Sequence, residues 1–269
     1  MADGSDLLGL ERARGAARVA LGPDGKLLRL GQQGSAKAFL PRVHGPVPEV
    51  VFLNTSGGLT GGDRLSFAVD LAPGVSALAT TQTAERAYAS AGGEARVTVD
   101  LSLGAGATLD WLPQETILFD RSALSRRTTA DLGPGARLML AEAVVLGRAA
   151  MGERVAQTTL CDWREVRREG RPVFLEPLRL TRATLGAGPA CLGPHRAVAT
   201  LALVADGAED ALGPVRDLLS TLAEVEAAAS GWDGRLIVRL MAADAFPLKR
   251  AMAAVVMATG RALPRVWQI

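Results

Sequence analysis

Large apolar side chains occupy every second position along two stretches of the first half of the chain, residues 66–71 (SFAVDL) and 96–101 (RVTVDL). A period of two places successive side chains on opposite faces of the backbone, so one face meets a core and the other meets water. Both stretches are therefore predicted to be β-strands that bury one face.

Each predicted strand runs into a short unit that recurs along the chain. The unit begins at Asp70, Asp100 and Asp131, so its copies lie 30 and 31 residues apart. Pro-Gly at 73–74 and 134–135 favours a tight turn, because proline presets φ and glycine accepts a positive φ. Second strands are predicted after the three turns, over residues 76–81, 107–112 and 136–145.

This repeat of about 30 residues indicates supersecondary units that stack on one another. The chain is therefore predicted to be mainly β, with a solenoid-like body of strand–turn–strand units over residues 1–196. The stretch before the third copy, residues 125–132 (SRRTTADL), alternates less clearly. An antiparallel sandwich whose turns happen to be evenly spaced is the alternative fold.

The pattern changes to mixed strand and helix in the last third of the chain. Pro247 and Gly260 suit the first turn and the stop of a helix. The predicted elements are a strand at 197–205, a helix at 209–229, a strand at 236–241 and a helix at 247–259. This α/β patch, at 197–262, is followed by a tail at 263–269. No flexible linker separates them from the body, so residues 1–269 are predicted to form one domain.

Composition narrows the range of partners. Lys and Arg number 30 and Asp and Glu 28, a balance that disfavours binding to nucleic acid or to an anionic membrane. The longest apolar runs, 197–205 and 251–258, are far shorter than the roughly 20 residues that a bilayer span needs. The N-terminus resembles no signal peptide, so a cytoplasmic protein is expected.

Histidine and cysteine are scarce. The chain has two of each: His44, His195, Cys161 and Cys191. Resident metals and acid–base chemistry near neutral pH usually depend on these residues. Cys191 and His195 could form half of a metal site, but no second pair completes it. No catalytic triad can be assembled, so we expect neither an enzyme nor a tightly bound cofactor.

Four short motifs follow one another along the chain. They are FLNTSGGLTGGDRL at 52–65, TTQTAERAY at 80–88, WLPQETILFD at 111–120 and LPRVW at 263–267. In sequence and order they resemble the signature motifs of the UreD (UreH) family. One departure concerns residues 54–56, Asn-Thr-Ser, where many members carry His-Pro-Pro, so no role of that histidine can be transferred.

The resemblance implies a scaffold or chaperone rather than an enzyme. Members of the family bind urease apoprotein and UreF, which in turn holds the GTPase UreG, and support GTP-dependent insertion of nickel into urease. Ni²⁺ would then be transient cargo. The implied fold is a two-layered β-helix with a small helical part, which agrees with the repeat.

Six acids lie in or beside the predicted β units: Asp63, Glu85, Glu115, Asp120, Glu142 and Glu176. Carboxylates bind Ni²⁺ less tightly than imidazole or thiolate, which suits a path that must release the metal. Asp63, Glu115 and Asp120 lie in the motifs and are predicted to line such a path. Alternatively, each acid is solvated, caps a turn or pairs with a neighbouring arginine.

The glycine-rich loop at 57–63 and the C-terminal tail have simpler interpretations. The loop lacks the Gly-Lys-Ser/Thr of a phosphate-binding loop, so tight turns explain its glycines best. In the tail, Arg265 and Trp267 are predicted to contact a partner, because Arg and Trp are enriched at interfaces. The alternative is that the tail plugs the protein's own surface.

Two other functions compete with the scaffold. The first is a carbohydrate-active β-helix enzyme that uses pairs of Asp and Glu. The eleven aromatic residues of the chain disfavour it, because carbohydrate clefts normally offer several aromatic platforms. The second is a structural solenoid without a ligand.

Overall fold

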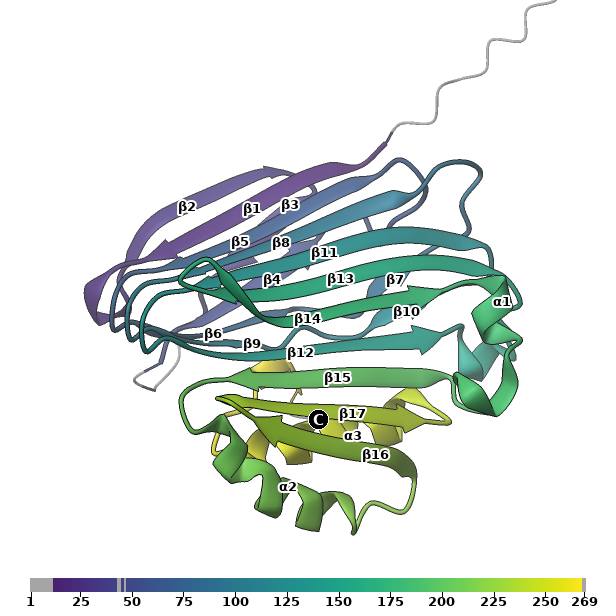
Figure 1. Ribbon diagram of the computed structural model, residues 1–269. Helices are drawn as coiled ribbons and strands as arrows, with labels where there is room; N and C mark the ends of the chain where they lie inside the picture. Colours follow the sequence, from purple (N-terminus) through teal and green to yellow (C-terminus); the bar gives the residue numbers. More distant parts are fainter. Residues whose placement is uncertain (1–11, 43–44, 46, 268–269) are drawn as a thin grey trace, which may run out of the picture.

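In this computed structural model, residues 12–42, 45 and 47–267 are described. Two β-sheets lie face to face and form the body, and helices cover the outer face of the second sheet at its C-terminal end (Figure 1). The first sheet contains, in spatial order, β14 (Arg171–Leu180), β13 (Thr158–Arg168), β11 (Ser122–Leu132), β8 (Ala95–Leu103), β5 (Arg64–Leu71), β1 (Arg14–Leu21) and β2 (Leu27–Gly34).

The second sheet carries the return strands of the coils and the C-terminal strands. Its order is β16 (Val225–Trp232), β17 (Arg235–Ala242), β15 (Ala197–Val204), β12 (Arg137–Leu146), β9 (Thr108–Trp111), β6 (Ser76–Thr81), β4 (Glu49–Asn54) and β3 (Ala36–Phe39). Two short strands, β7 (Glu85–Ala87) and β10 (Thr116–Leu118), pair with each other, and β10 also pairs with β12.

Each coil of the solenoid contributes one strand to each of the two sheets. Strands β5, β8, β11 and β13 pair in parallel, as do β4, β6, β9 and β12. This confirms the mainly β, two-layered solenoid, and it rules out the antiparallel sandwich for the body.

The turns between the layers stack on one another at one end of the solenoid. Gly74, Gly106 and Gly135 all have positive φ, and the Gly74 and Gly106 amides donate to the carbonyls of Ala105 and Pro134 in the next turn. The unit beginning at Asp100 is aligned differently from the prediction, because Asp70 and Asp131 both lie opposite Ser102. A shift of two residues keeps every side chain on its face, so alternation alone could not reveal it.

In the C-terminal part, the predicted helix at 209–229 is wrong in its second half. The 3₁₀ turn η4 (Ala208–Ala211) leads into α2 (Leu212–Leu219), and residues from Val225 form β16. The Ser220 and Thr221 hydroxyls hydrogen-bond to the Asp217 and Leu218 carbonyls at the end of the helix, a local competition that favours its termination. The other predicted elements are found as β15, β17 and α3 (Ala245–Ala258).

The remaining helical segments are short. They are η1 (Pro23–Gly25), η2 (Ala149–Met151), α1 (Arg182–Leu185), η3 (Gly188–Ala190) and η5 (Arg265–Trp267). No helix in the described ranges combines the length and apolar character needed to cross a membrane.

Two hydrophobic cores share strand β12. One core fills the space between the two sheets, and the other lies between the outer face of the second sheet and helices α2 and α3. Leu138 and Leu140 of β12 belong to the first core, and Met139 and Ala141 to the second. Burial on both faces explains why residues 138–146 of the strand are apolar apart from Glu142.

Candidate functional site

A row of alternating charges crosses the space between the sheets. Glu142 Oε2 lies 2.7 Å from Arg126 Nη1, and Arg126 makes a two-pronged contact with Asp162 at 2.9 and 2.6 Å. Asp162 also accepts hydrogen bonds from Arg164, which donates to Glu176 at 2.8 Å. Glu176 in turn accepts from Arg239, at 3.0 Å. These six residues are called the ionic row.

Strand alternation places these side chains. In β11 every second residue from Ser122 to Leu132 is buried, so Arg126 points into the interior at a position where an apolar residue would be expected. Parallel register then sets Arg126 beside Asp162 on β13, and antiparallel register sets Arg164 beside Glu176 on β14. The weak alternation of residues 125–132 therefore reflects polar residues that face inward.

The charges in the middle of the row stabilise one another. Burial by itself would raise the pKa of Asp162, but Arg126 and Arg164 outweigh it and lower that pKa to about 2. Burial would lower the pKa of Arg126, yet Asp162 and Glu142 raise it instead. Asp162 and Arg164 are each 2% exposed, so these charges depend on one another rather than on water.

An interior cavity of about 80 Å³ adjoins one end of the row. Arg126 and Glu142 line it together with Trp111, whose Nε1 donates to Glu142 at 3.1 Å. Glu85 lines it as well, and burial raises the pKa of that carboxyl although Asn54 Nδ2 donates to it at 3.1 Å.

A groove of about 430 Å³ lies at the other end of the row. It lies between β14 and the strands β15, β16 and β17 of the second sheet, and Arg164, Glu176 and Arg239 line it among apolar side chains of β15 and β17. Glu226 lies on the same groove, 3.5 Å from His195 Nε2. The ionic row thus occupies the interval between an inner cavity and an outer groove.

The ionic row buries several charges, but it offers no ready site for a stably bound metal ion. Each carboxylate of the row already faces an arginine, so a cation would have to displace a guanidinium group. Among the described residues, no group of three or more His, Cys, Asp or Glu is placed to hold a metal ion.

The acids predicted from the motifs lie elsewhere. Asp63 is buried and accepts hydrogen bonds from the amides of Ala13 and Thr60. Asp120 accepts from the amides of residues 156 and 157, which lower its pKa against a smaller opposing effect of burial. Glu115 lies 3.6 Å from Lys249 of α3. The three share no partner, and their role in a nickel path stays a prediction.

Residues 263–267 of the C-terminal tail pack against the protein's own second hydrophobic core. Trp267 is 5% exposed and packs near Lys249, whose Nζ lies 6.0 Å from the ring centre. Gln114 donates to the Val266 carbonyl at 2.9 Å. Arg265 and Trp267 were both predicted to contact a partner, but only Arg265 has an exposed side chain.

The double-glycine motif serves close packing between coils. A Cβ on Gly58 would lie 2.3 Å from the ring of Tyr88, and one on Gly61 would lie 2.3 Å from the Gly92 carbonyl oxygen. Gly58 also has a φ of 148°, which other residues rarely adopt. The motif therefore has a structural explanation that needs no bound phosphate.

Histidine and cysteine take little part in the site. His195 Nδ1 lies 2.9 Å from the Leu192 carbonyl, Cys191 is exposed, and Cys161 is half-buried as a free thiol. His44 lies outside the described residues.

Sequence reasoning identified Glu85, Glu142 and Glu176 among the acids but missed their partners Arg126, Asp162, Arg164 and Arg239. The sequence did contain one signal that could have revealed these partners. Residues 125–132 form a strand of the repeat with a charged residue, Arg126, at an inward position, and such a pattern indicates buried ion pairs.

Comparison with known proteins gives a consistent result. A family model described as "UreD urease accessory protein" matches residues 13–268. A urease accessory protein UreD of Cereibacter sphaeroides is 59% identical over 265 residues, covering 96% of each chain. One from Dinoroseobacter shibae is 53% identical over 266 residues, covering 97% of this chain and 94% of that one. One from Rhizobium leguminosarum is 43% identical over 266 residues, covering 96% of each chain.

Proposed function

The chain belongs to the UreD family of urease accessory proteins, and from this we propose that it acts as a scaffold in urease maturation. It binds urease apoprotein and UreF, and through UreF the GTPase UreG, and it supports GTP-dependent nickel insertion in the cytoplasm. The observation that carries this proposal is the family match over residues 13–268.

Nickel is cargo in this proposal, and Glu85 with the acids of the ionic row offers it a more continuous path than Asp63, Glu115 and Asp120 do. Glu85 at the cavity, Glu142 and Asp162 inside, and Glu176 at the groove lie along one polar line through the body. Carboxylates hold Ni²⁺ weakly, and within the ionic row the arginines neutralise Glu142, Asp162 and Glu176 until a cation arrives. Both features suit passage more than storage.

The ionic row gives no support to the carbohydrate-active enzyme. Its two working carboxylates would need one group with a raised pKa and one that is ionised and open to substrate. Within the ionic row the acids face arginines instead, and the pKa of Asp162 is lowered.

Nickel loading tests the scaffold role directly. Urease subunits, UreF and UreG are co-expressed with and without this protein, and nickel per urease active site is measured after purification. We expect loading to collapse without it. Equal loading in both cultures would overturn the proposal.

Glu85→Gln tests the path separately, because Glu85 forms no ion pair within the described part of the chain. We expect slower nickel loading with an intact complex. Glu224→Gln, an exposed acid on the surface, serves as the matched control. Glu115→Gln tests the motif-derived path, and full loading would remove Glu115 from it.

A further inference from the structure

The side chain of Asn54, at the end of β4, ties the loop that follows this strand to β7. Its Nδ2 donates to Glu85 Oε2 at 3.1 Å, and its Oδ1 accepts from the Ser56 amide at 3.1 Å. The Ser56 hydroxyl lies 2.7 Å from the same Oδ1. Asn54 and Glu85 both line the interior cavity, so the bond between them lies in the wall of the proposed nickel path.

The neighbours of Asn54 fix which way its amide faces. A backbone amide can only donate, so the Asn54 atom that faces Ser56 must be the oxygen. The nitrogen then faces Glu85, whose ionised carboxylate can only accept. The reversed amide would set donor against donor and acceptor against acceptor. The Glu85 carboxylate therefore meets a hydrogen-bond donor at this position.

The turn at residues 54–56 does not by itself account for an asparagine. The bond from the Ser56 amide to Oδ1 is an Asx turn, which aspartate forms as well as asparagine does. An aspartate at position 54 would face the Glu85 carboxylate with a second acceptor and a second negative charge. An amide serves both neighbours, because its oxygen accepts from the loop while its nitrogen donates to Glu85.

The donor from Asn54 counters the burial of Glu85. Burial raises the pKa of the Glu85 carboxyl, and the hydrogen bond from Asn54 makes the largest opposing contribution. The Arg86 amide, which donates to Glu85 Oε1 at 3.0 Å, and the charge of Arg86 also lower this pKa, whereas the charge of Asp63 raises it. Without Asn54, the balance would move further towards the protonated acid.

We propose that Asn54 is a positioning residue of the nickel path, whose amide fixes the Glu85 carboxylate at the cavity in the form that can bind a cation. This inference rests on the proposed function, and it adds the residue that prepares Glu85 for its task. A carboxyl group must be deprotonated to bind a metal ion. The other acid that lines the cavity, Glu142, is paired with Arg126 at 2.7 Å, so Glu85 is the acid there that a cation meets without displacing a guanidinium group.

The bond can be observed directly, because Asn54 is the only asparagine in the sequence and selective labelling therefore marks one side-chain amide group. The full-length protein is labelled with 15N-asparagine, and this signal is followed by NMR from pH 4 to 8. We expect it to shift with the titration of Glu85 and to stay constant in Glu85→Gln. No titration in the wild type, or the same titration in Glu85→Gln, would overturn the inference and leave the proposed function intact.

Nickel loading tests what the bond does. Asn54→Leu removes the donor and keeps the branched shape of the side chain, and Gln33→Leu, which removes an exposed amide on β2, is the matched control. Loading of urease by the purified complex with UreF and UreG is followed at pH 6, 7 and 8. We expect Asn54→Leu to slow loading about threefold or more at pH 6 and less at pH 8, because a higher pH ionises Glu85 even without its donor. The control should stay within about twofold of the wild type.

A merely structural role of Asn54 predicts a different pH profile. Loss of the turn alone would slow loading by the same factor at every pH, and that result, or unchanged loading, would overturn the positioning role while the proposed function stands. A wild-type complex that loads no nickel would overturn the proposed function and the inference with it. Thermal unfolding verifies the fold of each variant. Should Asn54→Leu fail to fold, the titration of the wild type against Glu85→Gln still decides the inference.

Discussion

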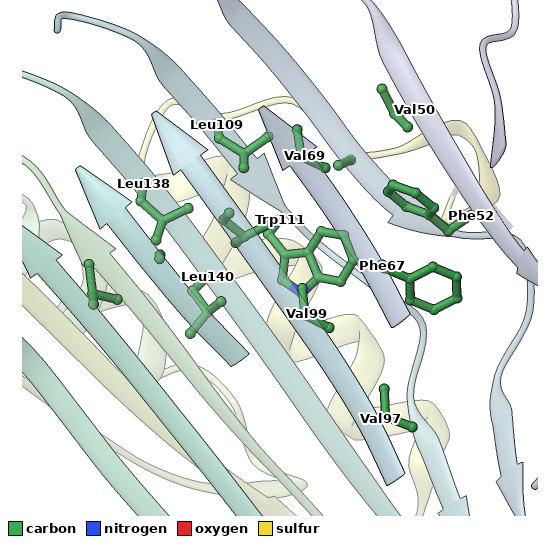
Figure 2. Packing of buried hydrophobic residues seen from close by; sticks show 14 of the residues in the cluster. Val50, Phe52, Phe67, Val69, Val97, Val99, Leu109, Trp111, Leu138 and Leu140 are labelled. Carbon is green, nitrogen blue, oxygen red and sulfur yellow. The ribbon is translucent and has the colours of Figure 1, made fainter. Parts of the chain in front are cut away.

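The space between the two sheets is filled in two different ways by one backbone architecture. Towards the N-terminal coils it is apolar, and Figure 2 shows Val50, Phe52, Phe67, Val69, Val97, Val99, Leu109, Trp111, Leu138 and Leu140 packed there. Towards β13 and β14 it holds the ionic row. Trp111 marks the border, because its ring lies 5.9 Å from that of Phe52 while its Nε1 donates to Glu142.

The two halves differ in what they contribute to stability. Apolar burial stabilises the fold by about 25 cal/mol for each Å² removed from water. Buried ion pairs roughly break even, because desolvation of the charges offsets their attraction. The apolar half therefore contributes most of the stability, and the ionic row contributes little to it.

The largest effect is expected when the row is broken at its centre. Asp162→Ala leaves Arg126 and Arg164 buried without their shared partner and should lower the free energy of unfolding by about 3–5 kcal/mol. Urea denaturation measures the change. Asp70→Ala removes an exposed Arg–Asp pair at 2.7 Å on the same sheet and should cost about 1 kcal/mol or less. Equal costs for the two variants would mean that the row is hydrated.

A cavity in the apolar half should cost slightly less. Leu109 is fully buried, so Leu109→Ala removes its contacts and should lower the free energy of unfolding by about 3 kcal/mol. Because the ionic row stays whole, nickel loading of urease should persist at a temperature where the variant is folded. Loss of loading in the folded variant would contradict this division of tasks between the halves.

The pH dependence of stability should distinguish a well-paired buried carboxylate, Asp162, from a poorly paired one, Asp110. Asp110 on the outer face of β9 has Arg261 at 3.2 Å, and burial raises its pKa to about 6 despite Arg261 and Arg137. The folded state therefore binds its proton more tightly, and Asp110 makes stability fall as pH rises through about 4 to 6, by at most about 1.4 kcal/mol per pH unit.

Asp162 has the opposite sign. Its pKa is lowered to about 2, so its contribution is present above pH 4 and is lost as pH falls from about 4 towards 2. Unfolding measured from pH 3 to 7 should show that Asp110→Asn makes the decline above pH 4 shallower, while Glu85, whose pKa burial also raises, keeps its own contribution. A decline that is unchanged in this variant would contradict the role of Asp110.

The smallest change in stability should come from replacing the buried charges together. Glu142→Leu, Arg126→Met, Asp162→Leu and Arg164→Met remove two charges of each sign and should leave the free energy of unfolding within about 2 kcal/mol of the wild type. Nickel loading should nevertheless fall, because the polar line through the body is gone. Normal loading by the stable variant would show that nickel does not use the row.

The sequence predicted the elements that follow regular periods. Strands β5, β8 and β12 and helix α3 could be read from alternation, continuous apolar runs and helix-stop residues, and the repeat pointed to a stacked solenoid. Strand β16 was missed because Val225 continues the helical spacing of the residues before it, and only its pairing with β17 decides its conformation. The two-residue shift of the repeat unit at Asp100 could not be predicted from the sequence, because both alignments place the same side chains in the interior.

What the sequence determined by itself is the family, the mainly β body and the shortage of metal-binding side chains, since motifs, periods and composition are local properties. The tertiary structure alone decided which charges meet. Arg126 and Asp162 lie 36 residues apart and face each other only because two coils stack in parallel register. Tyr88 and Phe119 likewise lie edge to face only because strands β7 and β10 pair in parallel register.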